Sequence, residues 1–183
     1  KDVPLTTLDK NGNKIENGEI PVAIELSSLK INKEDFTMTK GTSETLTVTG
    51  TPAEALEGQT ITWKSSNKDV VTVDSKGKVE AVGVGNATIT ATAAGKSDSV
   101  KITVNNPLKK ITVDPATLTL KKGTSKTLSV KYDPADTTDN KAVTWESSDK
   151  SVATVDANGK VTALKDGSAT ITAKVGKLTA TCA

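Results

Sequence analysis

The sequence predicts an all-β protein made of two similar sandwich domains in series. Three observations carry this prediction. A stretch of about 80 residues occurs twice, apolar residues recur at alternate positions within each copy, and turns rich in Gly, Asn and Asp separate these short runs. The duplication is plainest where ITWKSSNKDVVTVDSKGKVEA, residues 61–81, returns as VTWESSDKSVATVDANGKVTA, residues 143–163.

The composition is that of a folded protein without a nucleic-acid partner. Of the 183 residues, 34% are hydrophobic and 25% are charged, which is ordinary for a folded domain. The 24 positive charges are all lysine, are scattered along the chain and are offset by 22 acids, for a net charge of +2. Nucleic-acid binders instead concentrate Lys and Arg and add stacking aromatics. Aromatic residues make up only 2% of this chain.

The single cysteine and the apolar runs limit the covalent and membrane chemistry. Cys182 has no partner for an internal disulfide, so each domain must depend on packed apolar side chains. No apolar run is long enough for a membrane-spanning helix, and no signal-like segment precedes Asp2. We expect no membrane insertion, and we expect the chain to be a processed product or a fragment of something longer.

A shift of 82 residues aligns the chain with itself without a gap. About 30 of the 76 paired positions are identical. Each unit is large enough to bury its own core, so the units are expected to be domains at 26–104 and 108–183. The linker 105–107, NNP, is short and contains a proline, which restricts bending. Residues 1–25 lie outside the repeat and are either the tail of a preceding domain, an extra hairpin or a lead-in.

Apolar residues alternate with polar ones in both copies, as half-buried strands require. ATITA at 87–91 and at 169–173 is a clear case. About seven short strands per unit follow, separated by turns such as DSKG and DANG. The other inward pairs are Phe36 and Met38 with Leu118 and Leu120, Leu46 and Val48 with Leu128 and Val130, Ile61 and Trp63 with Val143 and Trp145, Val71 and Val73 with Ala153 and Val155, and Val79 and Ala81 with Val161 and Ala163.

Both copies contain W-x-S-S, then V-A-x-V, then G-x-V-x-A, then G-x-A-x-I-T, except that Val71 replaces the small residue that copy two has as Ala153. In this order, from about residue 26 to 183, the motifs resemble the group 2 bacterial immunoglobulin-like domain. The resemblance implies two tandem immunoglobulin-like β-sandwiches without disulfides and with the tryptophan in the core. It also implies a secreted or surface protein of bacteria, or a phage virion protein, and no catalytic residues.

Two positions depart from the repeat. Copy one continues its last strand through Ile102 and Val104, whereas copy two stops at Ala183, opposite Lys101. Tyr132 replaces Gly50, and we expect it to make a contact toward the solvent or toward the linker.

The residue types present argue against catalysis. Without His, and with no Cys in a plausible site, nucleophiles activated by His and zinc sites with His are excluded. Acids placed in the turns of a small sandwich with no evident cleft are poorly suited to general acid–base work. We therefore expect no enzyme, no catalytic residues, no metal site and no cofactor.

Calcium and sugar sites were weighed as alternatives. Asp9, Asn11 and Asn13 imitate the start of an EF-hand loop, but Lys14 stands where Gly is needed and Ile20 where Glu is needed. The turn acids Asp74, Asp156 and Asp166 could hold an ion between domains, although a turn Asp more often accepts hydrogen bonds from its own backbone. The loops KSSNKD and ESSDKS suit sugars, but the chain has no spare aromatic platform beyond Tyr132.

The function predicted is a non-catalytic stalk, spacer or adhesive module of a larger bacterial cell-surface or secreted protein. One alternative is an accessory of a phage tail or capsid, and another is a polysaccharide-binding appendage of an extracellular enzyme. The expected partner is a host or neighbouring surface protein, a glycan or a virion component, at an extracellular location.

Overall fold

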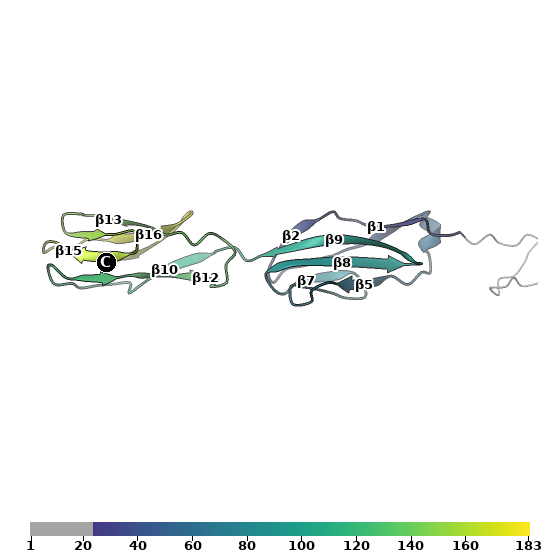
Figure 1. Ribbon diagram of the computed structural model, residues 1–183, viewed down its shortest axis with the longest axis horizontal. Coiled ribbons are helices and arrows are strands. Elements are labelled where there is room, and N and C mark those ends of the chain that lie inside the picture. Colours follow the sequence, from purple (N-terminus) through teal and green to yellow (C-terminus); the bar gives the residue numbers. More distant parts are fainter. Residues whose placement is uncertain (1–23) are drawn as a thin grey trace, which may run out of the picture.

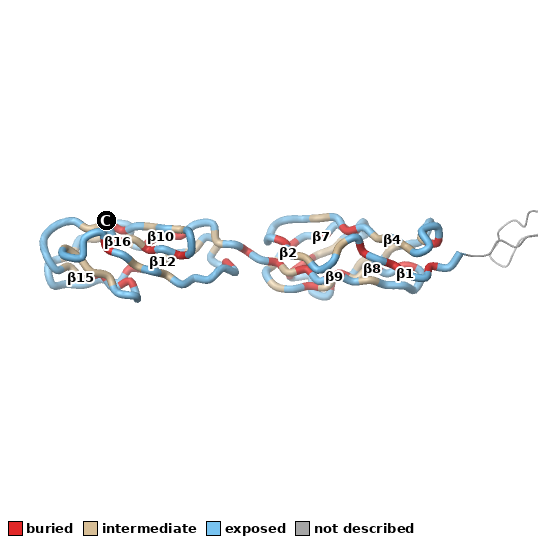
Figure 2. The backbone as a smooth tube through the Cα atoms, turned by 90° about the horizontal axis from the view of Figure 1, so that it is seen from above, coloured by how far each residue is buried: buried red, intermediate tan, exposed pale blue. Residues whose placement is uncertain are grey.

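The computed structural model describes residues 24–183, which form two all-β domains joined end to end (Figure 1). Strands β1–β9 make domain 1 and strands β10–β17 make domain 2. Each domain has its own cluster of buried apolar residues, which lie along its inside (Figure 2). The predicted all-β architecture of two tandem sandwiches without a disulfide is confirmed. Most of the segment 1–25 lies outside the described residues.

Domain 1 packs a four-stranded sheet, in the order β2-β9-β8-β5, against a three-stranded sheet, β3-β7-β6, while β1 pairs with β4. All pairs are antiparallel except β2 with β9, which is parallel. The elements are β1 (Ser28–Ile31), β2 (Phe36–Thr39), β3 (Ser43–Thr45), β4 (Val48–Thr51), the 3-10 turn η1 (Ala53–Leu56), β5 (Thr62–Ser65), β6 (Val71–Val73), β7 (Lys78–Ala81), β8 (Gly85–Ala93) and β9 (Lys96–Asn105).

Domain 2 repeats this plan with one strand fewer. Its sheets are β13-β16-β17, β11-β15-β14 and β10-β12, and every pair is antiparallel. The elements are β10 (Lys110–Asp114), β11 (Ser125–Thr127), β12 (Ser129–Asp133), β13 (Thr144–Ser147), β14 (Ala153–Val155), β15 (Lys160–Ala163), β16 (Ile171–Val175) and β17 (Leu178–Cys182).

The apolar residues that alternate with polar ones in the sequence are also the residues that are buried in the strands. In β8 the residues Ala87, Ile89, Ala91 and Ala93 are at most 2% exposed, while the threonines between them face outward or lie half-buried. Cys182, which aligns with the buried Val100, is also a core residue, and burial raises the pKa of its thiol. The apolar surface removed from water in this way holds each sandwich together.

Two strand predictions in copy two are wrong. The segment around Leu118 and Leu120 forms no ladder, and the strand predicted from 169 begins only at Ile171. In domain 1 both stretches pair with the end of β9, at Ile102 and Val104, and those residues have no counterpart in copy two. A pattern of alternating residues forms a ladder only where a partner strand is present.

The tryptophans lie closer to the surface than predicted. Trp63 and Trp145 are half-buried and pack against the edge of the two cores rather than inside them. Part of each indole remains accessible to solvent, as is common for this large side chain.

Candidate functional site: the joint between the domains

The joint between the domains begins where β9 ends. Asn105 is the last residue of the strand, and the next residue, Asn106, is only 7% exposed. A buried amide side chain needs hydrogen-bond partners, because an unpaired polar group away from water is costly. All the partners of Asn106 come from one loop of domain 2.

Asn106 is bound to this loop through its backbone and its side chain. Its backbone N–H donates to Thr138 Oγ1 at 3.1 Å, and its carbonyl accepts from the Thr138 N–H at 2.9 Å. The side-chain Nδ2 donates to Asp136 Oδ1 at 2.8 Å. These three bonds make Asn106 part of domain 2, although β9 holds the preceding residue in domain 1.

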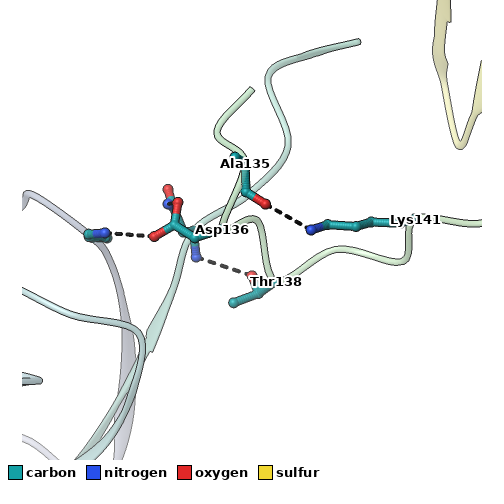
Figure 3. Close-up of polar contacts among 6 residues, drawn as sticks. Ala135, Asp136, Thr138 and Lys141 are labelled. Carbon is teal, nitrogen blue, oxygen red and sulfur yellow. Dashed lines mark hydrogen bonds and ion pairs between the residues drawn. The ribbon is translucent and has the colours of Figure 1, made fainter. Parts of the chain in front are cut away.

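Asp136 also connects domain 2 directly to domain 1. Its Oδ2 lies 2.7 Å from Lys40 Nζ, and the Lys40 backbone N–H donates to the Asn105 carbonyl at 2.8 Å. Asp136, labelled in Figure 3, thus accepts hydrogen bonds on both carboxylate oxygens, from Lys40 on Oδ2 and from Asn106 on Oδ1. The hydrogen bond from Lys40 is the main reason that the pKa of Asp136 is below its ordinary value. The two side chains are 37% and 54% exposed, so water and salt screen the pair.

Residues on the domain 2 side hold the loop in shape. The Tyr132 hydroxyl donates to the Lys141 carbonyl at 3.0 Å, and Lys141 Nζ donates to the Ala135 carbonyl at 2.8 Å (Figure 3). The same ammonium lies 5.3 Å from the centre of the Tyr132 ring, within cation–π range. Tyr132 therefore contacts the linker-side loop, which was one of the two environments expected for it.

The linker is also held beyond its proline. The Leu108 N–H donates to Asp139 Oδ2 at 2.9 Å, and the Asp139 N–H donates to Thr137 Oγ1 at 3.2 Å. Thr137 is itself buried. Residues on both sides of Pro107 are thus bonded to one loop, and Pro107 restricts its own φ angle. The three-residue linker is therefore held by contacts on both sides of its proline.

The turn acids weighed as calcium ligands are occupied by their own backbone. Asp74 Oδ1 accepts the N–H groups of Lys76 and Lys78, at 2.8 and 2.9 Å, and Asp156 Oδ1 accepts those of Asn158 and Lys160, both at 2.9 Å. The bond from Lys78 is the largest cause, and that from Lys76 the next, of the lowered pKa of Asp74.

The remaining candidate ligands do not come together within the part of the chain that the structure describes. Asp166 lies exposed in the loop before β16, and residues 24–183 contain no group of three acids or cysteine that could hold a metal. Asp9, Asn11 and Asn13, and with them the EF-hand-like loop, fall outside those residues.

The loops weighed as sugar sites use their hydroxyls within the fold. Ser65 Oγ donates to the Val71 carbonyl and Ser147 Oγ to the Ala153 carbonyl, both at 2.6 Å. The following serines, Ser66 and Ser148, each accept a backbone N–H of the neighbouring strand segment at 2.8 Å. The W-x-S-S motif therefore closes the loop after the tryptophan strand, which its sequence pattern alone did not reveal.

No helix among residues 24–183 has the length and apolar character to cross a membrane.

The chain is similar to parts of larger proteins with different activities. It is 41% identical over 105 residues to lacto-N-biosidase of Bifidobacterium bifidum, a match that covers 56% of this chain and 9% of that protein. It is 39% identical over 80 residues to the minor capsid protein of Enterobacteria phage T3, covering 43% of this chain and 18% of that one. The chain thus spans a small fraction of the curated relatives it matches.

The fold is also shared with solved structures of distant sequence. The four N-terminal Ig domains of a Dscam1 isoform match with a TM-score of 0.53 and 14% identity, over 87% of this chain and 46% of that one. The family model described as bacterial Ig-like domain (group 2) matches residues 26–104 and again residues 107–183. With its two sandwiches, its repeated W-x-S-S loop and this double match, the chain belongs to the group 2 bacterial Ig-like domain family.

Proposed function

We propose that this chain is a non-catalytic spacer segment of a larger bacterial surface or secreted protein. Its two domains hold the parts on either side of them at a set distance outside the cell. The observation that carries the proposal is the joint, in which Asn106 is buried and Asp136 is bonded to residues on both sides of the domain boundary. A flexible tether would need none of these contacts.

The strand arrangement also suits a segment that bears a load along its length. In domain 1, β2 and β9 pair in parallel from Phe36↔Ile102 to Thr39↔Asn105. The chain enters the domain through β1 and β2 and leaves it through β9. Tension between the ends therefore slides β2 against β9 and loads all bonds of this ladder together, whereas peeling would break them one at a time.

The relatives support a role that does not depend on one chemistry. A glycosidase and a phage capsid protein contain similar modules, although their named activities have nothing in common. A module that accompanies unrelated activities is best suited to positioning them.

A virion accessory is the second candidate, and the T3 capsid relative favours it. In a virion the two domains would separate their neighbours in the same way, with a tail or capsid protein as the partner. Sequencing of the parent gene separates the two, since an adjoining capsid or tail domain supports the virion and a cell-wall anchor supports the surface protein.

A polysaccharide-binding appendage is the third candidate, favoured by the glycosidase relative. A pull-down on insoluble polysaccharides, together with a glycan array, tests it. Specific retention there would contradict a pure spacer, in which no glycan is held.

Distances between spin labels test the spacer proposal directly. Lys64→Cys and Glu146→Cys place labels on exposed, equivalent positions of β5 and β13, and Cys182→Val removes the native thiol. We expect one narrow distance distribution between the labels. Asn106→Ala together with Asp136→Ala should broaden it, while Lys30→Ala, which removes an exposed ion pair with Glu34 within domain 1, should not. A broad distribution in the starting protein would contradict the proposal.

A further inference from the structure

The turn between β14 and β15 contains a chemically labile pair of residues, Asn158 and Gly159. The main-chain nitrogen that follows an asparagine can attack the carbonyl carbon of the asparagine side chain. Glycine hinders this attack least, because it has no side chain. Copy one has Lys76 before Gly77 at the same place, so the equivalent turn of domain 1 lacks this chemistry.

The reaction needs only the chain and water. The Gly159 nitrogen loses its proton and bonds to Cγ of Asn158, and the Cγ–Nδ2 bond breaks as ammonia leaves, which gives a five-membered imide. Water then opens the imide at either of its two carbonyl carbons. One product is an aspartyl residue, and the other is an isoaspartyl link, in which the main chain runs through the side-chain carbons and is one carbon longer.

The folded turn holds the attacking nitrogen away from this reaction. The Gly159 N–H donates to the Asp156 carbonyl at 3.1 Å, and Gly159 is buried although Asn158 is exposed. Asp156 Oδ1 also accepts the N–H groups of Asn158 and Lys160. Closing the imide ring rotates the Asn158 backbone and takes the proton from the Gly159 nitrogen, so the turn must open first.

The same glycine is bonded to the core of domain 2. Its carbonyl accepts the Leu128 N–H at 2.9 Å, and Leu128 is only 3% exposed. A Cβ atom added at Gly159 would lie 2.8 Å from Trp145 Cζ2, so the indole packs directly against this residue. Opening of the turn therefore disturbs the contacts of Leu128 and Trp145, and its frequency follows the local stability of domain 2.

An isoaspartyl link does not fit the folded turn. Gly159 has a φ of 78° and is held from three directions, by Asp156, Leu128 and Trp145. An extra main-chain carbon just before Gly159 moves it out of at least one of these contacts. The modified turn is therefore less stable than the original one.

We propose that Asn158 is a modification site controlled by the conformation of domain 2. Its amide is protected while the turn of residues 156–159 is closed, and it is lost by imide formation when the turn opens. The reaction is irreversible, so the modified chain keeps a record of the opening, and its domain 2 opens more readily afterwards. The inference concerns domain 2 alone and does not depend on the spacer role.

The rate of the reaction tests the protection. The full chain and a free peptide of residues 153–162 are incubated in the same mildly alkaline buffer, and mass spectrometry follows the loss of the Asn158 amide in both. We expect the reaction to be at least tenfold slower in the chain than in the peptide. Urea below the unfolding transition should speed it in the chain but not in the peptide, since it raises the open population.

Two variants test which contacts protect the site. Asp156→Ala removes the carboxylate bonds of the turn and should speed the reaction in the full chain. Asp74→Ala, the same change in the equivalent turn of domain 1, should leave the rate at Asn158 unaltered. Equal rates in the native chain and the peptide, or no effect of either urea or Asp156→Ala, would overturn the proposal.

Hydrogen exchange of the modified chain tests the consequence. Ion exchange separates this chain, because it carries one more negative charge. Peptides that cover Trp145 and Leu128 should exchange at least tenfold faster than in the unmodified chain, whereas those around Trp63 in domain 1 should not change. Fresh Asn158→Asp, which has the added charge without the extra carbon, should behave like the native chain. Equal exchange in the isoaspartyl and native chains would contradict the proposed effect on domain 2.

Discussion

Each tryptophan side chain packs against a glycine in a turn of the same domain, Trp63 against Gly77 and Trp145 against Gly159. A Cβ atom added at Gly77 would lie 2.9 Å from Trp63 Cζ2, and one added at Gly159 would lie 2.8 Å from Trp145 Cζ2. Both glycines have positive φ angles, of 80° and 78°. The glycine of the recurring G-x-V-x-A motif therefore meets two requirements: it adopts a left-handed backbone conformation, and it leaves room for the indole.

Gly77→Ala should destabilise domain 1 more than Gly41→Ala, and the comparison separates the two demands. Gly41 has a φ of 86° but nothing within 4 Å of an added Cβ, so it reports backbone strain alone, on the order of 1 kcal/mol. Gly77→Ala adds the clash with Trp63 and with the Leu46 carbonyl, and we expect a total loss of about 3 kcal/mol. Urea unfolding of both variants measures the difference, and equal losses would show that the indole moves aside freely.

Asp74 should make stability depend on pH in the acid range. Its backbone hydrogen bonds lower its pKa below the ordinary value of 3.8. A lowered pKa means that the folded state favours the carboxylate, so the stabilisation is present above about pH 4 and disappears as pH falls through the lowered pKa. The difference in melting temperature between the native chain and Asp74→Asn should therefore be constant from pH 7 to 5 and should shrink toward pH 2. A difference that persists unchanged at pH 2 would contradict this explanation.

Among the secondary-structure elements, the pair of β2 and β9 distinguishes the domains. In domain 1 it closes the four-stranded sheet, and Val100, Ile102 and Val104 of β9 are all at most 1% exposed. In domain 2 the sheet ends at three strands, β13-β16-β17. Several positions that are buried in domain 1, among them Met38 and Ala87, are only half-buried in domain 2, at Leu120 and Ala169.

Domain 2 should therefore be the less stable domain. A fragment that starts at Leu108 should still fold, because its core cluster is separate from that of domain 1. Because these residues of domain 2 bury less apolar surface, we expect its melting temperature to be lower by roughly 10 °C, which corresponds to a loss on the order of 2 kcal/mol. Calorimetry of the fragment and of residues 24–106 measures the melting temperatures of the two domains. The prediction would be contradicted if the fragment failed to fold, or if its melting temperature were higher than that of domain 1.

The sequence predicted the elements whose signals are local. Alternation in ATITA correctly placed Ile89 and Ile171 inward, and the DSKG and DANG turns were recognised from residue type. Leu118 and Leu120 were wrongly placed in a strand because their alternation is real but their partner strand is absent from copy two. The joint was predicted only through Pro107, since the contact of Lys40 with Asp136 joins residues 96 positions apart and involves no recognisable motif.

For the whole molecule, the joint determines the shape. Its hydrogen bonds from Asn106 are partly buried, whereas the ion pair of Lys40 with Asp136 is exposed and sensitive to salt. These partly buried bonds should keep the domains in line even where salt screens the ion pair. The long, narrow outline in Figures 1 and 2 follows from this arrangement.

Removal of calcium should leave both the domains and the joint unchanged. The carboxylates of Asp74 and Asp156 are occupied by backbone N–H groups, and Asp136 is bonded to Lys40 and Asn106. Melting curves with 5 mM calcium, about 5 to 50 times the dissociation constants of extracellular calcium modules, and with excess chelator should therefore coincide. A shift of several degrees would reassign these acids, or those of residues 1–23, as ligands.

Small-angle scattering of residues 24–183 tests the central claim, a stiff and extended pair of domains, most directly. The ten residues of β9 extend about 33 Å, so two such domains in line form a rod of about 70 Å with a radius of gyration of roughly 20 Å or more. A compact protein of this size would have a radius of gyration of roughly 15 Å. We predict the larger radius, unchanged between low and moderate salt. A radius near the compact value would contradict the account, because the domains would then be folded back on each other.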